Sequence, residues 1–184
     1  MTIQLGVKGS KLTRLADNGF FQEIALHVEH FMARYEEPRE FVPGVTRIPL
    51  NVPTYGAPEV IEALDSLLST YVTMGEKVKA FEEMFAEYVG VRNGIMTNSG
   101  SSANLLALSL LDLKPWHEVI TPALTWATTV FPIAQAGGTP VLVDVDRETY
   151  TISPDAIERA ISPTTRAIMP VHLLGNPCDM ERIV

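Results

Sequence analysis

Residues 139–171, TPVLVDVDRETYTISPDAIERAISPTTRAIMPV, contain the pattern that decides the fold. The runs VLVDV and RAIMPV are β-branched and apolar on both faces, as expected for strands buried between helices. Between them, Ser153 followed by Pro154 is a typical helix start, and Ser162 with Pro163 is a typical stop. The stretch therefore predicts a strand over Pro140–Val145, a helix over Pro154–Ile161 and a strand over Arg166–Leu173, which extends two residues beyond it.

The same alternation extends toward both ends of this stretch. Toward the N-terminus it predicts strands over Gly94–Thr97 and Glu118–Ile120, with helices over Ala103–Leu111 and Trp126–Ala136. Alternating strands and helices are typical of an α/β fold, so we expect a doubly wound, mostly parallel sheet. Toward the C-terminus a further helix begins at Met180, and the sheet looks incomplete. We therefore expect the chain to be the first part of a longer enzyme.

The first third of the sequence has a different organisation. Apolar residues at three- and four-residue steps predict an amphipathic helix over Phe20–Tyr35, and an extended arm rich in Pro and Gly follows over Glu36–Ala57. Two more amphipathic stretches follow the arm, the second ending at a predicted glycine cap, Gly90. We assign residues 1–57 to an N-terminal helix and arm, and residues 58–184 to the first part of a large domain.

Composition excludes several classes of protein. The 184 residues include 14 Lys and Arg against 22 Asp and Glu, so the net charge is −8, with no basic cluster of the kind that nucleic acids or anionic membranes attract. Cys178 is the single cysteine, which excludes a disulfide framework and a four-cysteine metal site within this sequence. No apolar run of about 18 residues predicts a membrane span. We expect a cytoplasmic protein with no metal.

The segment TNSGSSAN, residues 97–104, joins a predicted strand to a predicted helix. Its small residues leave backbone N–H groups accessible at the positive end of a helix, which is a typical phosphate cradle with Gly100, Ser101 and Ser102 as donors. The alternative is that these residues only cap the helix and form the turn. The sequence has no GxGxxG fingerprint, and no Lys follows the glycine as in a P-loop.

Trp126 follows the next predicted strand. In an α/β sheet this position faces the same carboxyl edge as Ser101, so the indole could stack on a flat ligand whose phosphate the cradle holds. Packing of the indole in the core is the alternative. Three further polar residues lie near or after the ends of predicted strands. Asp144 could simply cap a helix or lie in a turn, while His172 and Cys178 are interpreted as structural.

In their order and spacing, several segments resemble the nucleotide-sugar aminotransferases of the DegT/StrS type, which are fold-type I pyridoxal 5'-phosphate (PLP) enzymes. NSGSSAN together with FVPG is most similar to the branch that contains the sugar 3-dehydrases. The segments that carry the resemblance are FVPGVTRIPL, STYVTMGEKVKAFEEMFAEYVGV, MTNSGSSANLLALSLL, VITPALTWATTV, GGTPVLVDVD and TTRAIMPVHLLGNPCDM.

The resemblance implies that Gly100, Ser101 and Ser102 hold the cofactor phosphate and that Trp126 stacks on the pyridine ring. It also implies that the Asp that pairs with the pyridinium nitrogen, and the Schiff-base Lys (a His in the dehydrases), would lie beyond Val184. None of the five lysines present substitutes for the latter, so we expect no catalytic residue in this segment. The lysines are Lys8, Lys11, Lys77, Lys79 and Lys114.

The expected activity is transfer of an amino group from an amino acid to a nucleotide-linked keto sugar, by a homodimer that uses PLP. One alternative within the same family is 3-dehydration of a 4-keto-6-deoxy sugar with the pyridoxamine form of the cofactor. The other is a non-catalytic module that binds a phosphate ligand. The residue at the Schiff-base position would separate the first two, and the absorbance of the protein with PLP would separate both from the third.

Overall fold

The computed structural model describes residues 18–35, 40–48 and 54–184. Two compact units make up the chain, one ending at Ile95 and the other beginning at Met96. The domain boundary predicted after residue 57 lies within the first unit, and the assignment of domains stays a prediction.

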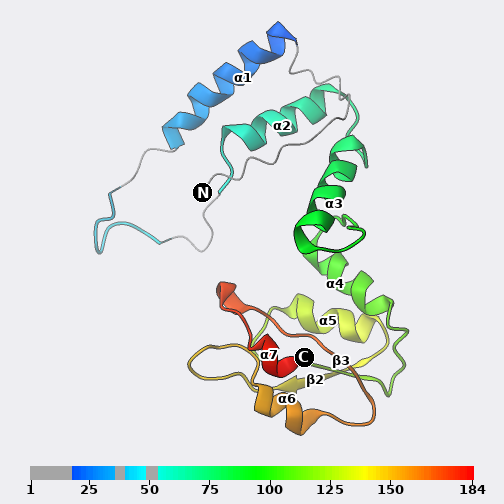
Figure 1. Cartoon of the computed structure of the whole chain (residues 1–184). Helices are drawn as coiled ribbons and strands as arrows, with labels where there is room; N and C mark the ends of the chain where they lie inside the picture. The colour runs from blue at the N-terminus through cyan, green and yellow to red at the C-terminus, as the bar shows by residue number, and fades with distance from the viewer. Residues whose placement is uncertain (1–17, 36–39, 49–53) are drawn as a thin grey trace. The chain divides into compact units, whose positions relative to one another are not determined.

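The first unit is helical in the residues that the structure describes (Figure 1). Asn18 caps the first helix by accepting a hydrogen bond from the N–H of Phe20 at 3.0 Å, and the predicted helix over Phe20–Tyr35 is confirmed, with its last three residues in 3-10 geometry. The elements are α1 (Gly19–Met32), η2 (Ala33–Tyr35), α2 (Ala57–Leu68) and α3 (Glu76–Val89).

Gly90 ends α3 as predicted. Its φ of 78° lies in the left-handed region, where a residue without Cβ is least strained, and the N–H of Val91 closes the turn onto the carbonyl of Ala86 at 2.9 Å. The predicted arm is irregular where it is described: residues 40–48 contain a turn in which Val42 accepts from the N–H of Thr46 at 2.8 Å. Residues 36–39 and 49–53 of the arm lie outside the described residues.

The second unit contains a three-stranded sheet in the order β2-β1-β3, with both pairs parallel. Ile120 is opposite Val141 on one side and Ile168 on the other. The parallel α/β fold predicted from the sequence is therefore confirmed. The strands are β1 (Glu118–Pro122), β2 (Thr139–Val143) and β3 (Thr165–Ile168).

Helices cover both faces of this sheet (Figure 1). Val119 packs with Leu108 and Ile133 on the face of α4 and α5, whereas its neighbour Ile120 packs with Ile152 and Ile157 on the face of α6. Consecutive strand residues point to opposite faces, so an apolar run in β1 serves both layers. The helices are α4 (Gly100–Ser109), α5 (Ala127–Gln135), α6 (Pro154–Ala160) and the short α7 (Met180–Ile183), and η3 (Leu173–Gly175) is a 3-10 turn.

Two predicted strands differ from the structure. Gly94–Thr97 is not a strand, because no strand of the described sheet pairs with it and a strand exists only through pairing. The last strand ends at Ile168, five residues before the predicted end at Leu173. Pro170 has no N–H for a sheet ladder, and Leu174 then turns the chain with a φ of 53°.

Within the described residues, no helix is long and apolar enough to cross a bilayer. The same residues contain no group of three or more His, Cys, Asp or Glu side chains arranged to hold a metal ion.

Candidate active site

The start of α4 is held by a side-chain cap. Ser99 Oγ accepts from the N–H of Ser102 at 3.2 Å and donates to Ser102 Oγ at 3.1 Å, while the Ser99 carbonyl accepts from the Thr97 hydroxyl at 2.9 Å. Ser99 was absent from the predicted cradle. Its signal in the sequence is a hydroxyl residue three positions before another polar residue at a helix start.

The first two N–H groups of α4 are available to a ligand. Within the described structure, neither the N–H of Gly100 nor that of Ser101 has a hydrogen-bond partner, and both residues are exposed. A Cβ built on Gly100 would meet nothing within 4 Å. Unpaired N–H groups in open space at the positive end of a helix are suited to binding an anion such as a phosphate.

Ser102 differs from its two neighbours in the cradle. Its N–H already donates to Ser99, so that donor is not free for a ligand. Its hydroxyl accepts from Ser99 Oγ, which leaves the hydroxyl proton of Ser102 able to donate elsewhere. Ser102 can therefore contribute to phosphate binding only through its side chain.

Trp126 lies at the start of α5, after the carboxyl end of β1. Its side chain is 76% exposed, so the alternative of core packing does not hold in this structure. The backbone at this point is fixed by two hydrogen bonds: the Trp126 carbonyl accepts from the N–H of Thr129 at 2.9 Å, and the Thr125 hydroxyl donates to that of Thr129 at 2.8 Å. Because Thr129 is buried, these bonds hold the backbone that carries the exposed indole.

One hydrogen bond joins the starts of α4 and α5. The Asn104 side-chain amide donates to the carbonyl of Thr128 at 3.1 Å. Asn104 is three residues after Ser101 on α4, and Thr128 is two residues after Trp126. This bond brings together the helix starts that carry the predicted cradle and the predicted stacking residue. Asn104 lies within TNSGSSAN, but the sequence pattern alone predicts no role for it.

The remaining polar residues near this edge have structural roles. His172 Nδ1 accepts from the N–H of Cys178 at 2.9 Å, and the Cys178 thiol donates to the carbonyl of Val171 at 3.1 Å. Cys178 is 5% exposed and belongs to the core beside α6. The structural interpretation of both residues is therefore confirmed. Asp144 neither caps a helix nor lies in a turn: its backbone carbonyl accepts from the N–H of Ser153 at 3.2 Å, next to the antiparallel bridge between Val145 and Ile152.

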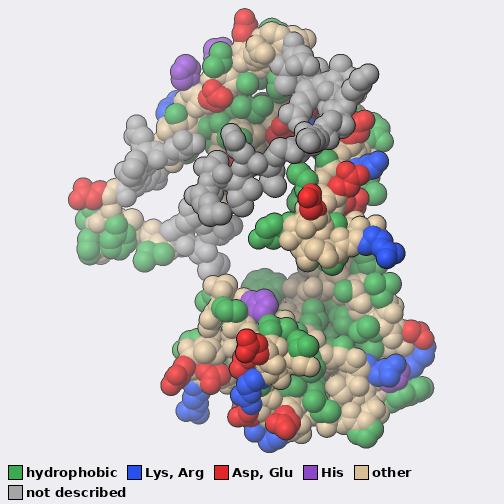
Figure 2. Space-filling model, in the orientation of Figure 1, with side chains coloured by type: hydrophobic (Ala, Val, Ile, Leu, Met, Phe, Trp, Pro, Cys, Tyr) green, Lys and Arg blue, Asp and Glu red, His purple; other side chains and the backbone are tan. Residues whose placement is uncertain are grey.

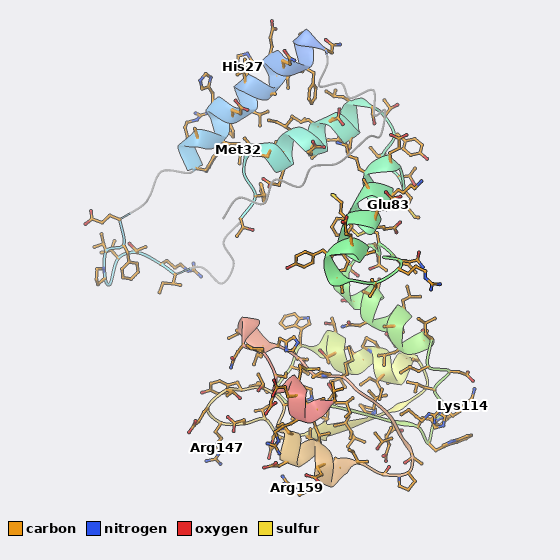
Figure 3. The ribbon with its side chains drawn as sticks, in the orientation of Figure 1. His27, Met32, Glu83, Lys114, Arg147 and Arg159 are labelled. Carbon is orange, nitrogen blue, oxygen red and sulfur yellow. The ribbon has the colours of Figure 1, made fainter. Side chains whose placement is uncertain are left out.

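No lysine of the described residues follows the carboxyl end of a strand. Figure 3 shows Lys114 and Arg147 at opposite ends of the sheet, since Lys114 precedes β1 and Arg147 follows β2. Lys77 and Lys79 lie on α3, where Lys77 is paired with Glu62 and Asp65 of α2 and Lys79 lies 4.0 Å from Glu83. The absence of a Schiff-base lysine from this segment stays a prediction, and Lys8 and Lys11 lie outside the described residues.

The sequence of residues 55–184 matches the family model described as the DegT/DnrJ/EryC1/StrS aminotransferase family. The chain belongs to this family. The resemblance carried by NSGSSAN and the neighbouring segments is thereby confirmed, and so is the expectation of a PLP-transferase fold.

Solved structures of the DegT/DnrJ/EryC1/StrS family are similar in fold and sequence. A protein of Streptococcus pneumoniae described as a sugar aminotransferase, in its PMP form, is 35% identical with a TM-score of 0.70, covering 75% of this chain and 35% of that one. The GDP-4-keto-6-deoxy-D-mannose-3-dehydratase of E. coli with bound hydrated PLP is 37% identical with a TM-score of 0.70, covering 74% and 37%. DesV of S. venezuelae, in complex with a ketimine intermediate, is 35% identical with a TM-score of 0.63, covering 68% and 34%.

The chain spans about a third of the length of these solved structures. Several of them contain PLP or PMP, so the cofactor expected from the sequence is the cofactor of its structural relatives.

Proposed function

We propose that this chain provides the phosphate- and ring-binding part of a PLP-dependent aminotransferase that acts on a nucleotide-linked keto sugar, with an amino acid as donor. The observation that carries the proposal is the combination at the starts of α4 and α5. Two unpaired N–H groups, of Gly100 and Ser101, and one indole that is 76% exposed, of Trp126, occur on helices joined by a hydrogen bond. Homology to sugar aminotransferases supports the same assignment.

The chain's own residues bind and orient in this proposal. The N–H groups of Gly100 and Ser101, with the hydroxyls of Ser101 and Ser102, donate to the phosphate oxygens at the positive end of α4. The indole of Trp126 limits the tilt of the pyridine ring by stacking on it. When bound, PLP supplies the electron sink for chemistry at the carbon that carries the amino group.

A second candidate is 3-dehydration of a 4-keto-6-deoxy sugar. The observation that favours it is the pair of segments NSGSSAN and FVPG, which are most similar to the dehydrase branch. The 3-dehydratase of E. coli, at 37% identity, is as similar to this chain as the aminotransferases are. The two activities share the phosphate cradle and the stacking residue, so these residues do not discriminate between them.

Product analysis separates the candidates. The full protein is incubated with PLP, glutamate and a nucleotide-linked 4-keto-6-deoxy sugar, and the sugar is analysed by mass spectrometry. Our proposal expects an amino sugar, with the keto oxygen replaced by an amino group. A 3-deoxy product would support the dehydratase instead. Unchanged sugar together with no change in the PLP spectrum would contradict both and favour a non-catalytic phosphate-binding module.

We also propose that the protein acts as a homodimer. Apolar side chains in the first unit are unusually exposed, including Phe20 at 70%, Phe31 at 49% and Phe41 at 57%. Figure 2 shows hydrophobic side chains gathered on residues 40–48 and on the surface around α1. Apolar surface of this kind is typical of a protein interface. A cytoplasmic location stays a prediction.

A further inference from the structure

We propose that Asn104 is a positioning residue that fixes Trp126 relative to the phosphate cradle, through its hydrogen bond to the carbonyl of Thr128. This inference rests on the proposed function of Gly100, Ser101 and Trp126. The amide of Asn104 is 24 positions away from Thr128 in sequence, and the bond of 3.1 Å is partly buried. It therefore ties together two helices that the chain could otherwise place with more freedom.

The sequence of α5 leaves the acceptor of this bond open. In an α-helix the carbonyl of Thr128 would accept from the N–H of the residue four positions later, which is Pro132. Proline has no N–H, so the helix cannot satisfy this carbonyl in the usual way. Pro132 is buried inside α5. The Asn104 amide supplies the donor that Pro132 removes, which makes the contact between the two helices specific.

The position of this bond gives it a consequence for ligand binding. Asn104 is one helical turn after Ser101, and Thr128 is in the first turn of α5, two residues after Trp126. A ligand with both a phosphate and a ring would contact both helix starts at once. The affinity for such a ligand depends on the distance between the phosphate cradle and Trp126. The affinity for a ligand with only one of these groups does not depend on that distance.

The test compares three ligands in the full protein. Pyridoxamine 5'-phosphate carries both groups, pyridoxamine carries only the ring, and inorganic phosphate only the anion. We expect Asn104→Ala to lower the affinity for pyridoxamine phosphate by about 5- to 10-fold, as for the loss of one hydrogen bond. The affinities for pyridoxamine and for inorganic phosphate should change by less than about 2-fold. Ser109→Ala is the matched control, because Ser109 Oγ donates only within α4, to the carbonyl of Leu105. We expect it to bind all three ligands like wild type.

The outcomes separate this inference from the proposed function. A wild-type protein that binds none of the three ligands would contradict the proposed function and this inference with it. If wild type binds pyridoxamine phosphate and Asn104→Ala binds it equally well, only the role of Asn104 is wrong. Equal losses for all three ligands with a lower melting temperature would also contradict that role, because they indicate general loosening of the fold.

A second variant tests the mechanism through Pro132. Pro132→Ala restores an N–H that can donate to the carbonyl of Thr128 within α5, so the helix no longer needs Asn104. In that background we expect Asn104→Ala to cost less than about 2-fold in affinity for pyridoxamine phosphate. The same 5- to 10-fold cost in both backgrounds would show that Asn104 does not act through this carbonyl.

Discussion

Gly100 occupies a position where neither backbone geometry nor packing demands a glycine. Its φ is outside the left-handed region, and a Cβ there would lie in open space. What glycine adds at the first residue of α4 is access to the backbone N–H groups. This is the pattern expected where a ligand approaches the main chain closely.

Gly100→Ala is therefore expected to affect binding and not folding. Replacing glycine where alanine fits the backbone stabilises a protein by about 0.4 to 1 kcal/mol, so the melting temperature of the full protein should stay the same or rise. The added methyl group obstructs the phosphate, and the affinity for PLP should fall by about 10-fold, or roughly 1.4 kcal/mol. Thermal melting and PLP titration measure the two effects. A less stable variant with unchanged affinity would assign Gly100 to the turn alone.

At the scale of single residues, the sequence allowed candidates for phosphate binding and ring stacking to be named. Gly100, Ser101 and Trp126 could be proposed as cofactor-binding residues because each follows a predicted strand in a segment that resembles the family, and their role stays a prediction. A cap was also accessible, because small polar residues before a helix are the usual capping signal and capping was the alternative interpretation of TNSGSSAN. The role of Asn104 had no local signal, since its acceptor lies 24 residues away and is defined only once α4 and α5 pack together.

Among the elements, helices and buried strands were predictable because their periodicity is local. The helix predicted over Pro154–Ile161 corresponds to α6, Pro154–Ala160, and the strand predicted over Pro140–Val145 corresponds to β2, Thr139–Val143. The prediction of a strand over Gly94–Thr97 was wrong, because strand formation depends on a neighbouring strand that sequence periodicity does not reveal. The end of β3 could have been placed earlier from Pro170.

A small charge network links α2 and α3. Lys77 Nζ lies 2.6 Å from a carboxylate oxygen of Glu62, 2.7 Å from one of Asp65 and 2.8 Å from the carbonyl of Glu62. Partial burial lowers the pKa of Lys77, but hydrogen bonds and charge from Asp65 and Glu62 outweigh it and raise that pKa above the ordinary 10.5. The stability from this network is complete below pH 10.5 and is lost as the pH rises through the raised pKa.

Lys77→Met should lower the free energy of unfolding of the full protein by about 0.5 to 1 kcal/mol at pH 7, since the network is partly exposed to solvent. Lys79→Met is the matched control on the same helix: Lys79 is 77% exposed and 4.0 Å from Glu83, and its loss should change stability by less than about 0.5 kcal/mol. Denaturant unfolding measures both. The difference between wild type and Lys77→Met should shrink above pH 10.5. A difference that persists there would mean that Lys77 stabilises by packing of its stem.

At the scale of the whole molecule, the exposed apolar side chains of the first unit bear on assembly. If they form the interface of the proposed homodimer, a charge at Phe20, which is 70% exposed, should weaken association without unfolding the chain. We expect Phe20→Glu in the full protein to sediment as a smaller species than wild type, with an unchanged circular dichroism spectrum. Leu174→Glu is the control, because Leu174 is 99% exposed in the second unit. Equal association of both variants with wild type would exclude Phe20 from the interface.

The most direct test of the account is a PLP titration of the full protein carrying Ser101→Ala or Trp126→Ala, with the melting of the cofactor-free proteins measured alongside. Ser101→Ala removes a hydrogen bond to a charged group, worth about 1.5 to 3 kcal/mol, so affinity should fall about 10- to 150-fold. Trp126→Ala should cost at least about 10-fold and shift the cofactor absorption, with little change in melting because the indole is exposed. Unchanged PLP affinity in both variants would contradict the cradle and the stacking residue together.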